Sequence, residues 1–259
     1  MSKFVEKVQR SHKVAIPQMG FHKAAETSEN PAMVLVADIT RLTAKLTKDI
    51  ISSGVDALIV NSTGLEVSSL NKLNKNGGDI PLGLLWNNSN TITIAEYVKA
   101  GIDFVIFDIN TTVETVNKQD LGKFLKVDSS LLPGMVKAIN DLTLLVDGVL
   151  ITNPGSAVTI ETLLVCKFFS DLLNKPLLFA ANSILSYSEL ESLHNSGVNV
   201  ILLPVSISVA DIADMTKSIL KLPRNVKKKT SMIAVLPGIS SGTTTPAPEE
   251  PEEEDDDDI

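Results

Sequence analysis

The chain has 259 residues, 44% of them hydrophobic but only 4% aromatic, so branched aliphatic side chains must fill its interior. Interiors of this kind are typical of parallel strands covered by helices on both faces. No apolar run reaches the roughly 18 residues of a membrane-spanning helix, and the N-terminus lacks a signal-peptide pattern. The single cysteine, Cys166, excludes an internal disulfide. We therefore expect a soluble protein of the cytoplasm.

The formal net charge of −8 comes from the C-terminal end, where residues 249–258 include nine acidic side chains. The rest of the chain holds 22 acidic and 23 basic residues, so it offers no broad positive surface for nucleic acid. Residues 240–259 are rich in Pro, Ser, Thr and acidic residues, and we expect a disordered tail there. Such a tail binds a basic protein partner, folds back on the basic cluster of residues 221–229, or serves only solubility.

Four segments repeat one pattern, in which Gly or Val precedes Asp or Asn by one or two positions and an apolar run follows. The acidic or amide residue stands at positions 56, 103, 147 and 199. Gly ends a helix in the left-handed conformation, and the apolar run predicts a buried strand. The intervals between these positions are 47, 44 and 52 residues, which leaves room for two β-α units in each.

Four further apolar runs lie between the repeats and predict the remaining strands, at residues 33–38, 79–86, 123–128 and 177–181. Helical periodicity separates the strands, and Ser186 with Glu189 predicts a capping box before one helix. Eight alternating units favour a closed (β/α)8 barrel over an open doubly wound sheet, which would leave unpaired edges. We expect a lead-in segment over residues 1–30, the barrel over 31–239 and the tail over 240–259.

Catalytic groups of such barrels lie at the carboxyl ends of the strands. The residues that follow the predicted strands are polar, and many are Asn or Asp. The candidate ligand-binding residues are Asn61, Trp86, Asn87, Asn110, Asn153, Gly155, Ser156, Asn182, Ser206 and Ser208, and the candidate catalytic residues are Asp38, Asp108, Lys126 and Asp128. The alternative for each Asn or Asp is that it starts a turn or caps a helix.

Lys126 is the most specific of these candidates. It shares strand parity with Phe124 and Asp128, so it is expected to point into the barrel. A lysine in that position can form a Schiff base or transfer a proton. The alternative is a structural ion pair with Asp128 or with Asp108 that closes the barrel.

Asp38 and Asp108 end strands one and four, and paired carboxylates can divide acid and base roles or hold a divalent metal. No histidine supports them, because His12 and His22 lie in the lead-in segment and His194 lies in a helix. We therefore predict no metal site and no cofactor.

The loop after strand six contains Gly155 and Ser156, whose N–H groups would face an anion if the helix began there. Trp86, the only tryptophan, either forms the floor of a ligand pocket or packs in the core. For Cys166, core packing is favoured over a role as nucleophile.

The Gly-x-Asp starts of the even strands, such as Gly54-Val55-Asp56, and the prolines before odd strands, such as Pro176, resemble the phosphate- and flavin-binding (β/α)8 barrels. That group includes the ribulose-phosphate-binding enzymes. The resemblance covers about 190 residues and implies the fold. Its phosphate-binding glycines are not matched, because residues 180–184 and 203–208 contain no Gly. Ser206 and Ser208 are the groups left there for a small anionic ligand.

Two functions stay open. The first is a barrel without catalysis that acts as a binding or scaffold subunit, and it predicts a mouth closed by side chains. The second is a lyase or isomerase that uses Lys126 with the neighbouring Asp and Asn residues, and it predicts a mouth open to solvent. The lack of histidines and of glycine-rich loops favours the first.

Overall fold

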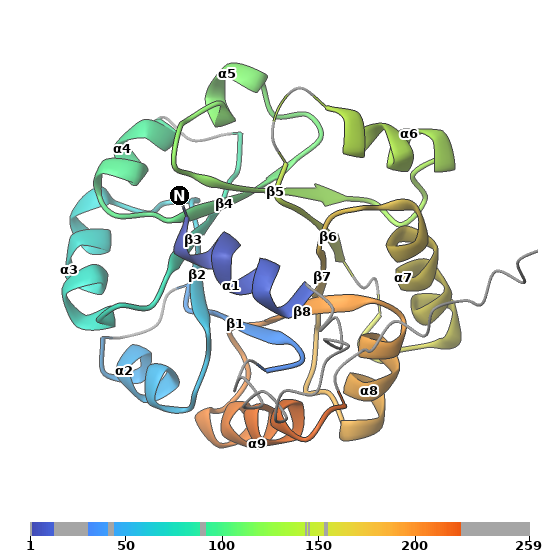
Figure 1. Ribbon diagram of the computed structural model, residues 1–259. Coiled ribbons are helices and arrows are strands. Elements are labelled where there is room, and N and C mark those ends of the chain that lie inside the picture. The colour runs from blue at the N-terminus through green and yellow to red at the C-terminus, as the bar shows by residue number, and fades with distance from the viewer. Residues whose placement is uncertain are drawn as a thin grey trace, which may run out of the picture. The chain divides into compact units, whose positions relative to one another are not determined.

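The computed structural model describes residues 2–12, 31–40, 44–88, 92–142, 144, 146–152 and 155–223. Eight parallel strands follow one another in sequence order, and the last pairs with the first, so the sheet is a closed barrel (Figure 1). The strands are β1 (Val34–Asp38), β2 (Ala57–Asn61), β3 (Leu82–Leu85), β4 (Phe104–Asp108), β5 (Gly122–Val127), β6 (Gly148–Thr152), β7 (Leu177–Ala180) and β8 (Val198–Leu203). The predicted (β/α)8 barrel is confirmed, and the open sheet is excluded.

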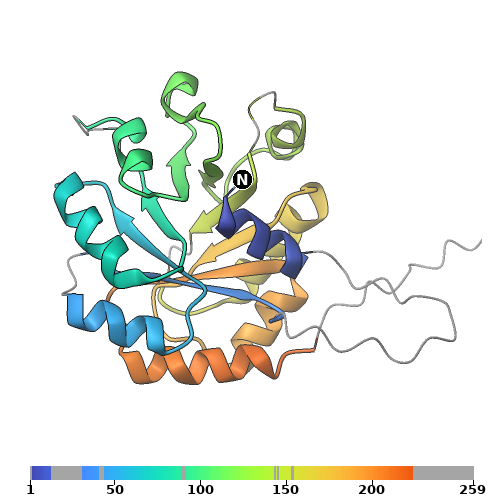
Figure 2. The same cartoon turned by 60° about the vertical axis from the view of Figure 1, so that its left-hand side comes forward.

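Helices surround the barrel and alternate with its strands (Figure 2). They are α2 (Ala44–Ser52), α3 (Val67–Gly77), α4 (Ile94–Lys99), α5 (Val113–Val116), α6 (Pro133–Ala138) with the 3-10 helix η1 (Ile139–Asp141), α7 (Ile160–Leu172), α8 (Tyr187–Asn195) and α9 (Val209–Leu220). The capping box predicted before α8 is present, since the Ser186 N–H donates to Glu189 at 2.8 Å and the Glu189 N–H donates to Ser186 Oγ at 3.3 Å. No helix in the described part of the chain is long and apolar enough to cross a membrane.

The alternation of side chains along each strand divides the apolar residues into two clusters. One fills the barrel and includes Ile59, Phe104, Phe124 and Leu150, while the other packs the outer face of the strands against the helices. Phe104 fills the interior because its neighbour on β3 is Gly83, where a Cβ would lie 2.2 Å from the Phe104 ring. Large aromatic residues therefore alternate with glycine inside the barrel, so that the layers interlock.

The repeated Asp and Asn residues tie the strands together at the amino-terminal end of the barrel. In three repeats the side chain accepts a hydrogen bond from a backbone N–H of the preceding strand: Asp56 from Leu35 at 3.0 Å, Asp147 from Lys123 at 2.8 Å and Asn199 from Leu177 at 3.0 Å. Burial raises the pKa of the Asp56 and Asp147 carboxyls. The sequence repeat therefore reflects a repeated bond between paired strands.

The fourth repeat residue, Asp103, instead holds an additional helix, α1 (Lys3–His12), at this end of the barrel. Its carboxylate accepts hydrogen bonds from the backbone N–H groups of Lys3 and Phe4, both at 2.9 Å, and from Ser2 Oγ at 2.7 Å. In Figure 1, α1 lies across the centre of the ring of strands. Lys3 also pairs with Asp79.

The buried face of α1 closes the barrel interior. Phe4, Val5 and Val8 are at most 4% exposed, and the Phe4 ring stacks on Phe104 with 4.0 Å between ring centroids. Residues 14–16 of the lead-in segment, Val-Ala-Ile, are apolar and predict a plug at this end, but they lie outside the described residues. The helix α1 before them fills that place, and the opposite face of the helix lies in solvent, where Lys3, Glu6 and Arg10 are exposed.

Candidate functional site

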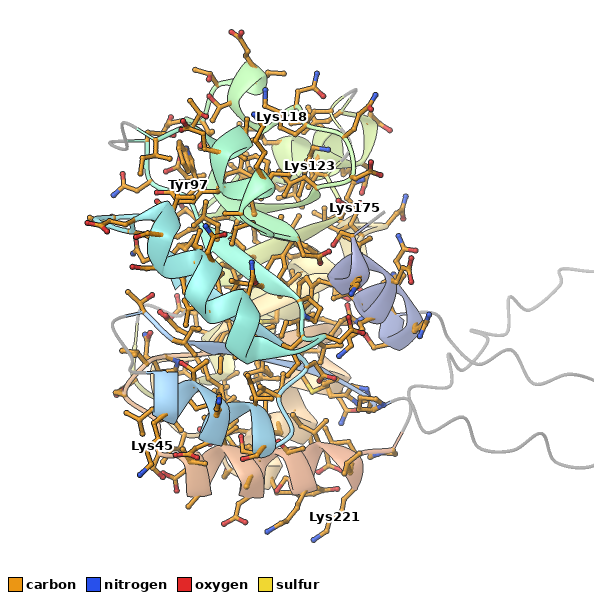
Figure 3. The ribbon with its side chains drawn as sticks, turned by 90° about the vertical axis from the view of Figure 1, so that its left-hand side faces the viewer. Lys45, Tyr97, Lys118, Lys123, Lys175 and Lys221 are labelled. Carbon is orange, nitrogen blue, oxygen red and sulfur yellow. The ribbon has the colours of Figure 1, made fainter. Side chains whose placement is uncertain are left out.

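The carboxyl ends of the strands form the mouth, at the end of the barrel away from α1. Figure 3 shows the two ends, with Lys45 near the start of α2 on the mouth side and Lys221 after α9 on the side of α1. The last inward-facing residues of the eight strands are Asp38, Asn61, Leu85, Asp108, Lys126, Thr152, Ala180 and Leu202. Each is partly or fully exposed, whereas the residue two positions earlier on the same strand is buried. The strand ends are therefore half-buried at the mouth, with Lys126 exposed among them, above a closed apolar floor.

Lys126 lies in this mouth on the strand parity that places Phe124 in the barrel interior. Its side chain is exposed, and its register partner on the neighbouring strand is Asp108. Among the described residues, Lys126 forms no hydrogen bond and no ion pair. The alternative interpretation, an ion pair with Asp128 or Asp108 that closes the barrel, is therefore not seen. Its ammonium group is accessible to a bound molecule.

The loops that follow the carboxyl ends of the strands form the rim of the mouth. Four of the candidate site residues on this rim use one side-chain oxygen to start a turn. The Oδ1 atom accepts a hydrogen bond from the N–H two positions on, at 2.8 Å for Asp38 and at 2.9 Å for Asn61, Asp108 and Asp128. Hydrogen bonds from the Ser130 hydroxyl and N–H lower the pKa of the exposed Asp128 carboxyl. The turn interpretation thus accounts for one oxygen of each residue.

Short polar residues that sequence reasoning did not select connect neighbouring loops of the rim. Thr40 Oγ1 accepts from the Asn61 N–H at 2.8 Å, and the buried Ser62 accepts from the Asn87 N–H at 2.9 Å. Thr152, which ends β6 on the inward parity, was also not selected. Its signal in the sequence is that it lies two residues after Leu150, which faces the interior.

Trp86 does not belong to the mouth. It follows the inward-facing Leu85, so its side chain points outward, and it is 9% exposed within the core between strands and helices. Its ring meets Tyr97 edge-on at a centroid distance of 6.4 Å, and its Nε1 donates to Asn88 at 3.0 Å. Of the two positions considered for Trp86, the structure has the core position.

The loop after β6 does not form a helix-terminus anion site at Gly155 and Ser156, because α7 begins later, with Thr159 as its N-cap. The carbonyl oxygen of Gly155 instead accepts from Asn182 Nδ2 at 2.9 Å, and that of Ser156 accepts from Ser183 Oγ at 2.6 Å. These residues join two adjacent loops of the rim. Asn153 lies outside the described residues.

The N-terminus of α9 already holds a carboxylate. Ser208 caps this helix, accepting from the Asp211 N–H at 3.3 Å and donating to Asp211 Oδ2 at 2.5 Å. Glu189 is the corresponding carboxylate at the N-terminus of α8, and hydrogen bonds from Ser186 lower the pKa of its carboxyl. A carboxylate at a helix N-terminus uses the field that would attract a phosphate, so Ser208 is engaged in capping rather than poised for an anion. Ser206 is exposed in the turn before it.

Within the part of the chain that the structure describes, no three side chains of His, Cys, Asp or Glu come close enough together to hold a metal ion. His194 lies on α8 with 3% of its surface exposed, and this burial lowers the pKa of its imidazole. The polar groups at the inward-facing ends of the described strands are carboxylates, an amide, a hydroxyl and the ammonium group of Lys126.

The closed barrel, with its polar rim at the carboxyl ends of the strands, places the chain in the class of (β/α)8 barrels and confirms the fold-level resemblance to the ribulose-phosphate-binding group. The sequence matches no family model and no curated protein.

Solved structures with this fold include a mutant tryptophan synthase alpha-subunit from the hyperthermophile Pyrococcus furiosus, with 10% identity over 73% of this chain and 97% of that chain and a TM-score of 0.55. A protein from Aquifex aeolicus VF5 matches with 12% identity over 87% of this chain and 100% of that chain, and a TM-score of 0.62. A chain of the tryptophan synthase α2β2 complex of Pyrococcus furiosus matches with 10% identity over 72% and 95%, and a TM-score of 0.54. At these identities the likeness is one of fold.

Proposed function

We propose that this protein is a small-molecule enzyme, a lyase or isomerase, in which Lys126 contacts a carbonyl-bearing substrate at the barrel mouth. One observation carries the proposal: the inward-facing Lys126 is exposed above the apolar floor, in register with Asp108, and makes no polar contact within the described residues. The side chains of the rim Asp and Asn residues accept hydrogen bonds that stabilise turns, whereas the Lys126 side chain makes no such structural contact among the described residues. An accessible lysine on a rigid strand is suited to contact a ligand.

The chemistry open to Lys126 is imine formation. The ammonium group gives one proton to Asp108, and the nitrogen then attacks the carbonyl carbon. The carbonyl oxygen leaves as water with that proton and one further N–H proton, so that the nitrogen keeps its third proton in a protonated imine. The protonated imine then withdraws electrons from an adjacent C–H or C–C bond, which is the step that a lyase or isomerase needs.

Asp108 is the residue we assign to proton transfer. It lies on the strand next to Lys126, and adjacent strands are about 4.8 Å apart. Its Oδ1 is committed to the N–H of Asn110 and approaches Thr111 Oγ1 at 3.5 Å, which fixes the carboxylate plane. Asn61 and Thr152 are suited to hydrogen-bond the substrate, and Asp38 and Asp128 to orient it from the rim.

The non-catalytic interpretation depends on a mouth closed by side chains, and the partial exposure of all eight inward strand ends does not favour it. The solved structures with this fold that are named for tryptophan synthase belong to an enzyme, which agrees with a catalytic role here. A fold hosts many activities, however, so the assignment depends on the mouth itself.

Reductive trapping tests the proposal. The full chain is incubated with pyruvate, glyoxylate or dihydroxyacetone and borohydride, and modified lysines are located by peptide mass spectrometry. We expect at least one of these carbonyl compounds to label Lys126 about ten-fold more than Lys45, an exposed lysine at the start of α2. Lys126→Met should remove this labelling, whereas Lys45→Met should preserve it. Equal labelling of the exposed lysines with all three compounds would contradict the imine role.

A further inference from the structure

The charged side chains at the barrel mouth are mainly acidic. Asp38 and Asp108 are inward-facing strand ends, and Asp128 lies on the rim after β5. Lys126 is the only basic residue among the eight inward-facing strand ends, all of which the structure describes. Asp108 is its register partner on β4, and Asp128 lies two positions after it. These four groups together leave an excess of negative charge beside Lys126.

The segments around the mouth have the same bias, although the body of the chain is balanced. Their strand ends, rim loops and first helical turns hold nine acidic and three basic residues, whereas residues 1–248 as a whole hold 22 acidic and 23 basic residues. The basic residues are Arg41, Lys45 and Lys126, of which Arg41 lies outside the described residues. The segments counted are residues 38–47, 61–70, 85–97, 108–116, 126–136, 152–163, 180–190 and 202–212.

Two of the carboxylates at the mouth keep an oxygen for a ligand. The Oδ1 atoms of Asp38 and Asp108 each accept the N–H of a turn. In the described part of the chain, no hydrogen bond reaches the Oδ2 atom of either residue. An ionised carboxylate only accepts hydrogen bonds, so these atoms suit a donor such as an ammonium group.

The helix N-termini after β7 and β8 do not favour a phosphate. Barrels of this fold frequently bind phosphate with the loops after these strands and a nearby helix N-terminus. Here Glu189 and Asp211 lie in the first turns of α8 and α9, where they accept hydrogen bonds from Ser186 Oγ at 2.8 Å and from Ser208 Oγ at 2.5 Å. These carboxylates already compensate the positive ends of the two helices, so they would repel a phosphate dianion.

We propose that the substrate of the mouth is a carbonyl compound that carries a protonated amine and no phosphate or carboxylate group. This inference rests on the imine role proposed for Lys126 and names the class of substrate. Carboxylates that surround a site raise the local concentration of cations and disfavour anions. Asp38 is the acceptor that we assign to the ammonium group of the substrate, because Asp108 is assigned to proton transfer.

Three small methyl ketones test the charge preference on the full chain. Aminoacetone is a cation, hydroxyacetone is neutral and pyruvate is an anion. Each is trapped with borohydride, and labelling of Lys126 is divided by that of Lys221, an exposed lysine at the opposite end of the barrel (Figure 3). This quotient removes the intrinsic reactivity of each ketone. It should be at least about ten-fold higher for aminoacetone than for pyruvate, with hydroxyacetone between them.

An isosteric change at Asp38 tests its assigned role. Asp38→Asn keeps an oxygen that can accept the N–H of Thr40, but it removes the charge. The quotient for aminoacetone should fall by about three-fold or more, whereas that for hydroxyacetone should change less. Asp214→Asn removes an exposed carboxylate from the outside of α9 and should leave both quotients unchanged. Circular dichroism confirms that each variant folds.

A cysteine probe measures the same preference without imine chemistry. Asn110→Cys places a thiol on the exposed rim two positions after Asp108 and keeps every charged side chain of the mouth. The thiolate displaces methanesulfinate from two methanethiosulfonate reagents, one with a trimethylammonium group and one with a sulfonate group. The ratio of the two rates should be at least about five-fold higher for Asn110→Cys than for Ser52→Cys, at the exposed end of α2. Added salt should reduce this difference, because it screens exposed charges.

The two measurements separate failure of this inference from failure of the imine role. Labelling of Lys126 by pyruvate as strong as that by aminoacetone would overturn the charged substrate and leave the imine role intact. A rate ratio for Asn110→Cys no higher than that for Ser52→Cys would also overturn it. If no ketone labels Lys126 above Lys221, the imine role fails, and the cysteine ratio alone decides whether the mouth selects cations.

Discussion

Asp103 and Phe4 are separated by 99 positions in the sequence, yet the carboxylate of Asp103 accepts a hydrogen bond from the Phe4 N–H at 2.9 Å. The same carboxylate accepts from the N–H of Lys3, so it satisfies two of the amides at the start of α1 that have no partner within the helix. A residue of the strand repeat thus also serves as the anchor of the helix that closes the barrel.

Asp103→Ala should lower the free energy of unfolding by about 1–3 kcal/mol, because the N–H groups of Lys3 and Phe4 at the start of α1 lose a charged acceptor. Urea denaturation followed by circular dichroism measures this change. Asp128→Ala is the matched control, since that carboxylate is exposed and bonds only locally to Ser130 among the described residues. We expect it to cost less than about 1 kcal/mol. Equal losses in the two variants would mean that α1 contributes little to stability.

Gly83→Ala should destabilise the barrel, because the new Cβ would lie 2.2 Å from the Phe104 ring. Moving a packed aromatic ring costs about 1–3 kcal/mol. Gly134→Ala is the control, since a Cβ at that position in α6 meets no atom within 4 Å. Alanine in a helix is favoured over glycine, so this variant should gain up to about 1 kcal/mol. The midpoint temperature of thermal unfolding measures both effects. It should fall in Gly83→Ala, where the methyl group meets the Phe104 ring, and should not fall in Gly134→Ala, where the methyl group meets no atom.

The boundary between barrel floor and mouth lies between Phe124 and Lys126, and the two positions should respond differently to truncation. Phe124→Ala removes a fully buried ring and should cost about 3–5 kcal/mol. Lys126→Ala removes an exposed side chain and should change stability by less than about 0.5 kcal/mol. Urea denaturation of both variants checks this. A large loss at Lys126 would show that the lysine supports the fold rather than a ligand.

The sequence was sufficient to predict the barrel because its repeat has a structural cause. Asp56, Asp147 and Asn199 each accept a hydrogen bond from a backbone N–H of the preceding strand, so an Asp or Asn recurs before three of the four even-numbered strands. Strand parity also indicated the inward position of Lys126, because alternation in a strand is strict. These predictions rest on local periodicity alone.

Other features depend on contacts between distant segments and could not be read in the same way. The apolar face of α1 is visible in the sequence as Phe4, Val5 and Val8, but its place at the barrel end is set by Asp103 and the Phe104 ring. Gly155 and Ser156 were considered as one possible start of α7, whereas the hydroxyl of Thr159 caps this helix. Gly and Ser suit many loop positions, so they do not identify the N-cap by themselves.

Cys166 should be inert in the folded protein. Burial raises the pKa of its thiol to about 12, and the side chain has no exposed surface. With this pKa, about one thiol in ten thousand is ionised at pH 8. A thiol reagent should therefore label the native protein only at the rate at which α7 unfolds, and should label it at once in urea. The variant Ser129→Cys, at an exposed turn, should react quickly without denaturant.

His194 should make the protein less stable in mild acid. Burial lowers the pKa of its imidazole below the ordinary value of 6.5, so the unfolded chain takes up a proton at a higher pH than the folded chain. The free energy of unfolding therefore falls as the pH drops below about 6.5 and stops falling once the folded imidazole is also protonated. Between pH 7 and pH 5.5 we expect a loss of about 0.5–1 kcal/mol from this residue.

Urea denaturation at a series of pH values measures this effect as the difference between the native chain and His194→Gln. The variant should lose less stability over this range, whatever its stability at neutral pH. Asn195→Gln is the control, because Asn195 is exposed beside His194 at the end of α8 and neither an asparagine nor a glutamine side chain titrates. Asp56 and Asp147 act in the opposite direction, since their raised pKa values favour the folded state as the pH falls. They are unchanged in both variants and cancel in the difference, so a His194→Gln profile parallel to that of the native chain would contradict the assignment.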